Sequence, residues 1–80
     1  MRDIPVHNSN WSGAKNESFN WNNPNNTDSV ITQDGGNPWP FTLASPVTIN
    51  AGTSLPCSLV GASGTYGYIC DANPKTVIIT

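Results

Sequence analysis

The chain ends in Gly64-Thr-Tyr-Gly-Tyr-Ile-Cys70-Asp-Ala-Asn73-Pro74-Lys-Thr-Val-Ile-Ile-Thr80, and this stretch decides the fold class. Aromatic and β-branched residues, which fit a pleated and half-buried surface, lie on both sides of the cysteine. The closing run over 76–80 consists almost entirely of β-branched residues, as in strands that are buried on most sides. We therefore predict a strand that leads to Cys70, a short loop, and a closing strand.

The rest of the chain carries further strand signals and no helix signal. Apolar residues do not recur at helical spacing, and Pro and Gly interrupt the chain every few residues. Alternation or β-branched content predicts strands over 4–6, 18–22, 29–33, 46–50 and the two arms of a hairpin within 55–70. Short strands at intervals of about 8–12 residues indicate an all-β fold, either an antiparallel β-sandwich or a small barrel, and we predict the small antiparallel β-sandwich.

The length of 80 residues predicts a single domain over 1–80. Its least defined part is 1–17, which we expect to be either a loop or an edge strand. The formal net charge of −2, with three basic side chains, excludes a basic surface for nucleic acid. No apolar run approaches the roughly 20 residues of a membrane helix.

The composition favours a secreted or periplasmic protein. Charged residues make up 10% of the chain, Asn and Thr are abundant, and there are two cysteines. Disulfides persist in oxidising compartments, so a cysteine pair in a small domain is typical of exported proteins. The chain shows no signal peptide, and export is therefore an expectation from composition alone.

The two cysteines, Cys57 and Cys70, permit three interpretations: a disulfide, a pair of free buried thiols, or metal ligation. The segment between them resembles a hairpin with its tip at 61–64, which would place both sulfur atoms on neighbouring strands. A small domain with a thin core gains most from a crosslink. We therefore favour a Cys57–Cys70 disulfide, which would stabilise the fold by about 3 kcal/mol.

The layout of strand, cysteine loop and closing strand resembles the C-terminal end of the cupredoxins, the small blue-copper β-sandwiches. Cys70 and Pro74 match the copper loop of that family. Three further segments are similar to cupredoxin strands: Phe19-Asn-Trp21-Asn-Asn23, Val47-Thr-Ile-Asn-Ala-Gly52 and Gly64-Thr-Tyr-Gly-Tyr-Ile-Cys70. The resemblance covers about residues 18–80 and implies a Greek-key sandwich.

The same resemblance implies where copper ligands would stand, and neither position holds a histidine. Ser29 (or Asp28) and Asn73 occupy the places of the two family histidines, and no methionine follows Cys70. Hydroxyl and amide oxygens are poor copper ligands, so we expect no bound metal and no other cofactor. His7 matches no ligand position and is expected to face solvent on an edge strand, although a soft site of His7, Cys57 and Cys70 stays open.

No pattern of residues indicates an enzyme. A catalytic triad needs a histidine beside a nucleophile, and the chain has one histidine, near its N-terminus. Trp39, between Pro38 and Pro40, is the candidate binding residue, because a rigid aromatic can stack on a sugar or anchor a protein. The alternative, which we favour, is that Trp39 closes one end of the sandwich.

We therefore expect a non-enzymatic, exported, cupredoxin-like domain without copper that has a structural or interaction role. Two alternatives remain. One is electron transfer or copper binding through a non-standard site. The other is recognition of a carbohydrate or a protein through Trp39. No pattern in the sequence identifies the partner.

Overall fold

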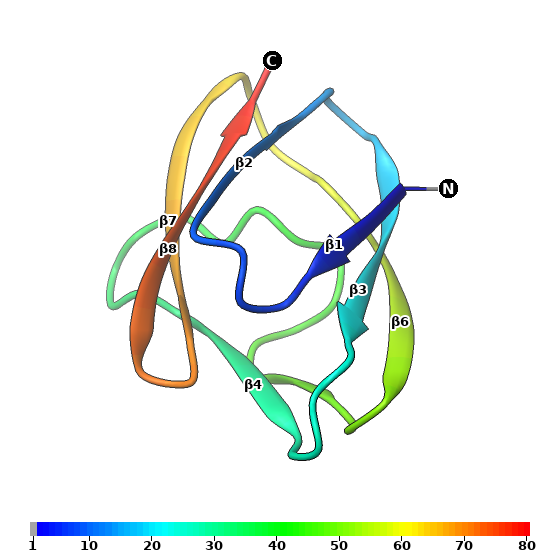
Figure 1. Cartoon of the computed structure of the whole chain (residues 1–80). Helices are drawn as coiled ribbons and strands as arrows, with labels where there is room; N and C mark the ends of the chain where they lie inside the picture. The colour runs from blue at the N-terminus through cyan, green and yellow to red at the C-terminus, as the bar shows by residue number, and fades with distance from the viewer. Residues whose placement is uncertain (1) are drawn as a thin grey trace.

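Eight strands in two facing sheets make up the computed structural model, which describes residues 2–80 (Figure 1). One sheet has the strand order β1 (Arg2–Pro5), β3 (Ser18–Asn23), β6 (Thr53–Ser58). The other has the order β2 (Asn10–Gly13), β8 (Asn73–Ile79), β7 (Gly64–Cys70), β4 (Ser29–Gln33), β5 (Val47–Ile49). The all-β sandwich predicted from the sequence is confirmed, and within residues 2–80 no helix is long and apolar enough to cross a membrane.

Both sheets are mixed: most of their strand pairs are antiparallel, as predicted, but each sheet also contains one parallel pair. β1 pairs in parallel with β3, and β2 pairs in parallel with β8. The cause is the N-terminal segment, because residues 2–13 contribute one edge strand to each sheet rather than a loop. Parallel neighbours need a long connection, which the chain supplies by crossing to the other sheet between the paired strands. The Greek-key connectivity stays a prediction.

The hairpin predicted within 55–70 does not form. Its two arms are strands, β6 and β7, but they belong to different sheets: β6 pairs with β3, and β7 pairs with β4 and β8. In the β6 register Cys57 lies opposite Phe19 and Leu55 opposite Trp21. Each arm thus faces the core from its own sheet, which buries more apolar surface than a two-stranded ribbon would.

An aromatic layer fills the space between the sheets. Trp21 of β3 contacts Trp11 of β2 edge-on at 5.6 Å and Tyr68 of β7 at 5.9 Å between ring centroids. Phe41 lies 5.2 Å from both Trp21 and Tyr68. The indole N–H of Trp11 donates a hydrogen bond of 2.8 Å to the buried Tyr68 hydroxyl. Because each ring buries on the order of 150–250 Å², this layer supplies most of the core of so small a domain.

A buried asparagine at the end of β3 organises the following loop. The Asn23 side chain is fully buried, and its amide nitrogen donates to the carbonyl oxygens of Thr27 and Ile49 at 2.9 Å each. Its oxygen accepts a hydrogen bond of 3.1 Å from the backbone N–H of Asn25. Asn23 therefore joins the loop that precedes β4 to the end of β5.

We expect Asn23→Ala to lower the free energy of unfolding by at least about 2 kcal/mol, because it removes the donor to the buried carbonyl of Ile49 and to the half-buried carbonyl of Thr27. In a domain of this size that loss corresponds to a decrease in Tm of roughly 8–16 °C. Thermal unfolding followed by circular dichroism measures it. Asn26→Ala, at an exposed position of the same loop, is the matched control and should change Tm little. Equal effects of the two substitutions would contradict the role given to Asn23.

A two-residue turn joins β7 to β8 and sets the direction of the cysteine loop. Asp71 and Ala72 have φ of +50° and +69°, and two successive left-handed residues are what a type I′ hairpin turn requires. Asp tolerates this conformation, whereas alanine does so at a cost of about 1–2 kcal/mol. The predicted order of strand, short loop and closing strand is confirmed here.

Replacing Ala72 by Gly should therefore raise the free energy of unfolding by about 1 kcal/mol, because Gly adopts φ > 0 without steric cost. The corresponding increase in Tm is roughly 4–8 °C. Ala44→Gly is the control, since Ala44 is exposed and outside the left-handed region. A variant at position 72 no more stable than the wild type would show that the turn carries no such strain.

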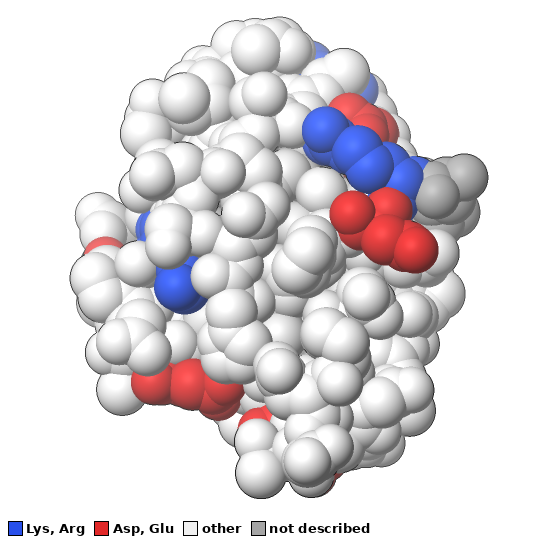
Figure 2. Space-filling view, in the orientation of Figure 1, with Lys and Arg blue, Asp and Glu red and all other residues white. Residues whose placement is uncertain are grey.

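Charged side chains are sparse on the molecular face shown in Figure 2. One charged group lies beside the N-terminus of β1, where Arg2 forms an ion pair with Glu17 at 3.1 Å and donates to the carbonyl of Ser12 at 2.7 Å. Acidic atoms also gather near the turn between β7 and β8, and this second group belongs to the candidate site.

Candidate metal centre

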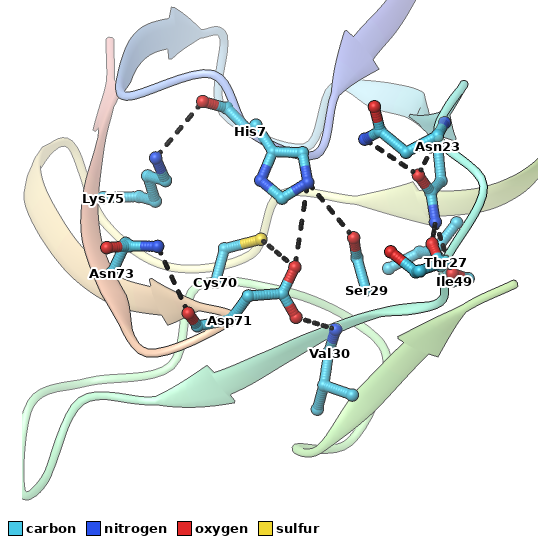
Figure 3. Close-up of polar contacts among 11 residues, drawn as sticks. His7, Asn23, Thr27, Ser29, Val30, Ile49, Cys70, Asp71, Asn73 and Lys75 are labelled. Carbon is cyan, nitrogen blue, oxygen red and sulfur yellow. Dashed lines mark hydrogen bonds and ion pairs between the residues drawn. The ribbon is translucent and has the colours of Figure 1, made fainter. Parts of the chain in front are cut away.

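His7, Cys70 and Asp71 meet where β7 turns into β8, and each offers one atom that can ligate a metal ion (Figure 3). The three atoms lie within 4.8 Å of one another. Nε2 of His7 is 3.7 Å from Oδ2 of Asp71, and Sγ of Cys70 is 3.8 Å from the same oxygen. An imidazole, a thiol and a carboxylate thus converge from the two ends of the chain.

The turn and strand β4 fix the carboxylate of Asp71. Its Oδ1 accepts a hydrogen bond of 2.9 Å from the backbone N–H of Val30. The backbone N–H of Asp71 in turn donates to the carbonyl of Val30 at 3.0 Å. The first bond engages Oδ1, the second holds the backbone of Asp71, and Oδ2 is left directed at His7 and Cys70 (Figure 3).

The loop between β1 and β2 carries His7 and is held at both sheets. The neighbouring Val6 is fully buried, and its N–H donates to the carbonyl of Asn22 at 2.9 Å. From the other sheet, Nζ of Lys75 donates to the carbonyl oxygen of His7 at 3.2 Å. The imidazole is therefore placed by backbone contacts on both sides of it, while its ring stays exposed.

Burial raises the pKa of the Cys70 thiol to about 11, and the negative charge of Asp71 adds to the increase. The thiol is therefore protonated at neutral pH. Reactive cysteines owe their nucleophilicity to a lowered pKa, so this environment does not make an activated nucleophile. A bound cation would supply the charge that favours the thiolate.

Two of the three separations between the donor atoms are close to those around a transition-metal ion. Tetrahedral zinc, with Zn–S of about 2.3 Å and Zn–N or Zn–O of about 2.0–2.1 Å, places its ligand atoms about 3.3–3.6 Å apart. The observed distances of 3.7 Å and 3.8 Å exceed that range by a few tenths of an ångström. The third pair of donor atoms, on His7 and Cys70, lies within 4.8 Å, so the side chains must draw together to hold an ion.

The same cluster does not form a catalytic triad. Ser29 Oγ lies 3.4 Å from His7 Nε2, which is also the nitrogen that faces Asp71. A triad histidine uses one ring nitrogen for the nucleophile and the other for the carboxylate. Ser29 is also 1% exposed, which leaves its hydroxyl inaccessible to a substrate.

The two positions that the cupredoxin resemblance assigned to ligands have different surroundings. Ser29, on β4, borders the cluster through its contact with His7. Asn73, the first residue of β8, donates from its side-chain amide to the backbone carbonyl of Asp71 at 3.2 Å. Its amide is thus engaged with the turn itself.

The predicted Cys57–Cys70 disulfide is wrong, because both cysteines are free and buried. Cys57 is in β6 of the three-stranded sheet and Cys70 in β7 of the five-stranded sheet, so the neighbouring strands that the prediction required do not exist. The Cys57 sulfur lies 3.7 Å from both the hydroxyl of Thr42 and the carbonyl oxygen of Ser58. One of the grounds for expecting export is thereby removed.

Trp39 packs against the core rather than projecting from it. Its ring meets Phe41 edge-on at 5.0 Å, and its indole N–H donates to the carbonyl of Leu43 at 2.6 Å. The side chain is half-buried, as expected of a residue that closes one end of the sandwich. The carbohydrate or protein site at Trp39 stays a prediction, with the indole N–H already engaged.

Sequence reasoning placed His7 on solvent-facing backbone and did not connect it with Asp71. His7 and Cys70 lie near opposite ends of the chain, and zinc motifs are recognised by short spacings that are absent here. The pairing of β2 with β8 brings the two ends together, and only a signal for that pairing would have revealed the site.

Comparison with protein-family models gives no match, and comparison with curated proteins finds none of significant similarity.

Proposed function

We propose that this protein is a non-enzymatic, cupredoxin-like β-sandwich that binds one zinc ion through His7, Cys70 and Asp71. The observation that carries the proposal is the convergence of three different donor atoms within 4.8 Å. Thiolate, imidazole and carboxylate are the three zinc ligands that proteins use. The resemblance of the Cys70 loop to a copper loop supports a metal site at this end of the sandwich.

The geometry around the cluster supports binding rather than catalysis. His7 cannot serve Ser29 and Asp71 through separate nitrogens, because both face Nε2. Cys70 lacks the lowered pKa of a catalytic thiol. A metal ion needs neither arrangement, only donors that are free to turn toward it.

Metal binding would also add a direct link between the two sheets. His7 belongs to the loop that leaves β1 of the three-stranded sheet, whereas Cys70 and Asp71 end a strand of the five-stranded sheet. An ion between them therefore connects the two sheets near one end of the sandwich. A ligand that binds only the folded state adds its binding free energy to stability.

We expect one equivalent of Zn²⁺ to bind, measured by titration calorimetry on the reduced protein. At a free zinc concentration of 100 times Kd, stability should rise by about 2.7 kcal/mol. In a domain of this size the corresponding increase in Tm is about 10–20 °C.

His7→Ala and Cys70→Ser should each weaken zinc binding at least roughly 100-fold, because changes to residues that merely support a ligand already cost roughly 10–100-fold. The matched control is Cys57→Ser, which removes the other buried thiol and leaves the cluster intact. Wild-type affinity in either ligand variant, or loss of binding in the Cys57 variant, would overturn the assignment.

Copper is the second candidate, because Cys70 and His7 pair a thiol with an imidazole and Cu²⁺ stands above Zn²⁺ in the affinity order. If copper is the bound metal, electron transfer becomes the candidate function of the protein. Cu²⁺ added without oxygen should then produce an intense sulfur-to-copper absorption in the visible spectrum. The band should vanish in Cys70→Ser and persist in Cys57→Ser. A spectrum without the band would leave zinc as the metal.

A further inference from the structure

We propose that the metal ion bound at this centre keeps one coordination position open to solvent, where it takes a thiol or imidazole donor from another molecule. This inference rests on the proposed metal-binding function. It makes the ion exchangeable cargo that the protein can pass on, instead of a permanent structural element. Structural zinc sites are closed by four protein ligands, whereas sites that exchange or activate a ligand keep a position free.

The described chain supplies three strong donors at this place, and its other polar groups there are directed elsewhere or are poor ligands. Ser29 offers a neutral hydroxyl, a weak ligand for zinc or copper. The amide of Asn73 donates to the carbonyl of Asp71. The ammonium of Lys75 donates to the carbonyl of His7 and, being cationic, cannot ligate a metal.

The exposure of the three ligands shows on which side the open position lies. Cys70 is fully buried, while the side chains of His7 and Asp71 are 47% and 33% exposed. An ion bound by all three side chains would therefore face the protein interior on the side of the Cys70 sulfur. It would face solvent on the side of His7 and Asp71. In Figure 3 the imidazole reaches the cluster from the β1–β2 loop, opposite the strand that carries Cys70.

The class of the incoming ligand follows from the metal. Zinc and copper take thiolate and imidazole donors in preference to neutral oxygen. In the transfer step an external thiol releases its proton to solvent and forms a metal–sulfur bond. The bond from the metal to Cys70 then breaks, and Cys70 regains a proton. The bonds to His7 and Asp71 break in turn as further donors of the acceptor replace them, and the ion leaves. The oxidation state of the ion does not change, so no electron donor or acceptor is needed.

The test uses the full chain loaded with one equivalent of Co²⁺, with imidazole and 2-mercaptoethanol as probes in separate titrations. We expect saturable changes in the visible cobalt spectrum and, by native mass spectrometry, a complex of one protein, one cobalt and one probe molecule. If cobalt does not bind, the proposed function itself fails. If cobalt binds but neither probe changes its spectrum or joins the complex, the open position is overturned and the metal-binding function stands.

A variant in which a side chain of the protein itself fills the open coordination position should respond to the probes in the opposite way. Ser29 Oγ is 3.4 Å from His7 Nε2, so an imidazole introduced by Ser29→His would stand beside the ion. We expect Ser29→His to bind cobalt at least about tenfold more tightly, in line with the effect of a single group at a metal site. It should also lose the response to imidazole, whereas Ser29→Ala should retain it.

Circular dichroism establishes whether Ser29→His folds, since residue 29 is buried. A folded variant with unchanged affinity and an unchanged response to imidazole would overturn the proposal. If that variant does not fold, the probe titrations on the wild-type chain decide alone. As a kinetic readout, transfer of cobalt from the wild-type chain to a chelator should accelerate with 2-mercaptoethanol concentration, and independence of thiol would contradict exchange through an open position.

Discussion

The aromatic packing between the two sheets is the interaction on which the other features depend. Trp21 reaches from the three-stranded sheet to Trp11 and Tyr68 of the five-stranded sheet, with ring centroids 5.6 Å and 5.9 Å away. The bond from the Trp11 indole to the Tyr68 hydroxyl satisfies both polar groups inside this layer. A chain of 80 residues buries only about 60–65% of its unfolded surface, so a few large rings must supply most of its cohesion.

That packing also determines how the N-terminal segment is held, and hence the candidate site. Ile4 and Val6 are buried on one side of His7, and Trp11 is buried on the other. The loop between these anchors has little freedom to move away from the β7–β8 turn. The imidazole therefore stays close to Cys70 although its own ring makes few contacts.

Sequence patterns located most strands because the signals are local. The β-branched run 29–33 coincides with β4, and the alternating run 18–22 lies within β3. Pairing was harder to predict, since it depends on which apolar faces meet. The glycines after β6 resemble a hairpin tip, yet Cys57 and Leu55 of β6 pair with Phe19 and Trp21 of β3 and not with β7, which belongs to the other sheet.

The candidate site was only partly visible in the sequence for the same reason. The resemblance to a copper loop directed attention to Cys70, and Ser29 does lie at the cluster. Nothing local in the sequence connects His7 with either residue. The parallel pairing of β2 with β8 makes that connection, and such pairing between distant segments leaves no periodic trace in the sequence.

The pairing of β2 with β8 has a consequence for the order of folding events. Residues 10–13 pair with residues 76–79, so β2 can join the larger sheet only after β8 has been synthesised. Topologies dominated by contacts between remote segments fold slowly, because loop closure precedes any gain from the contacts. During synthesis the imidazole is thus exposed long before the thiol arrives, and the complete ligand set exists only after the final strand has docked.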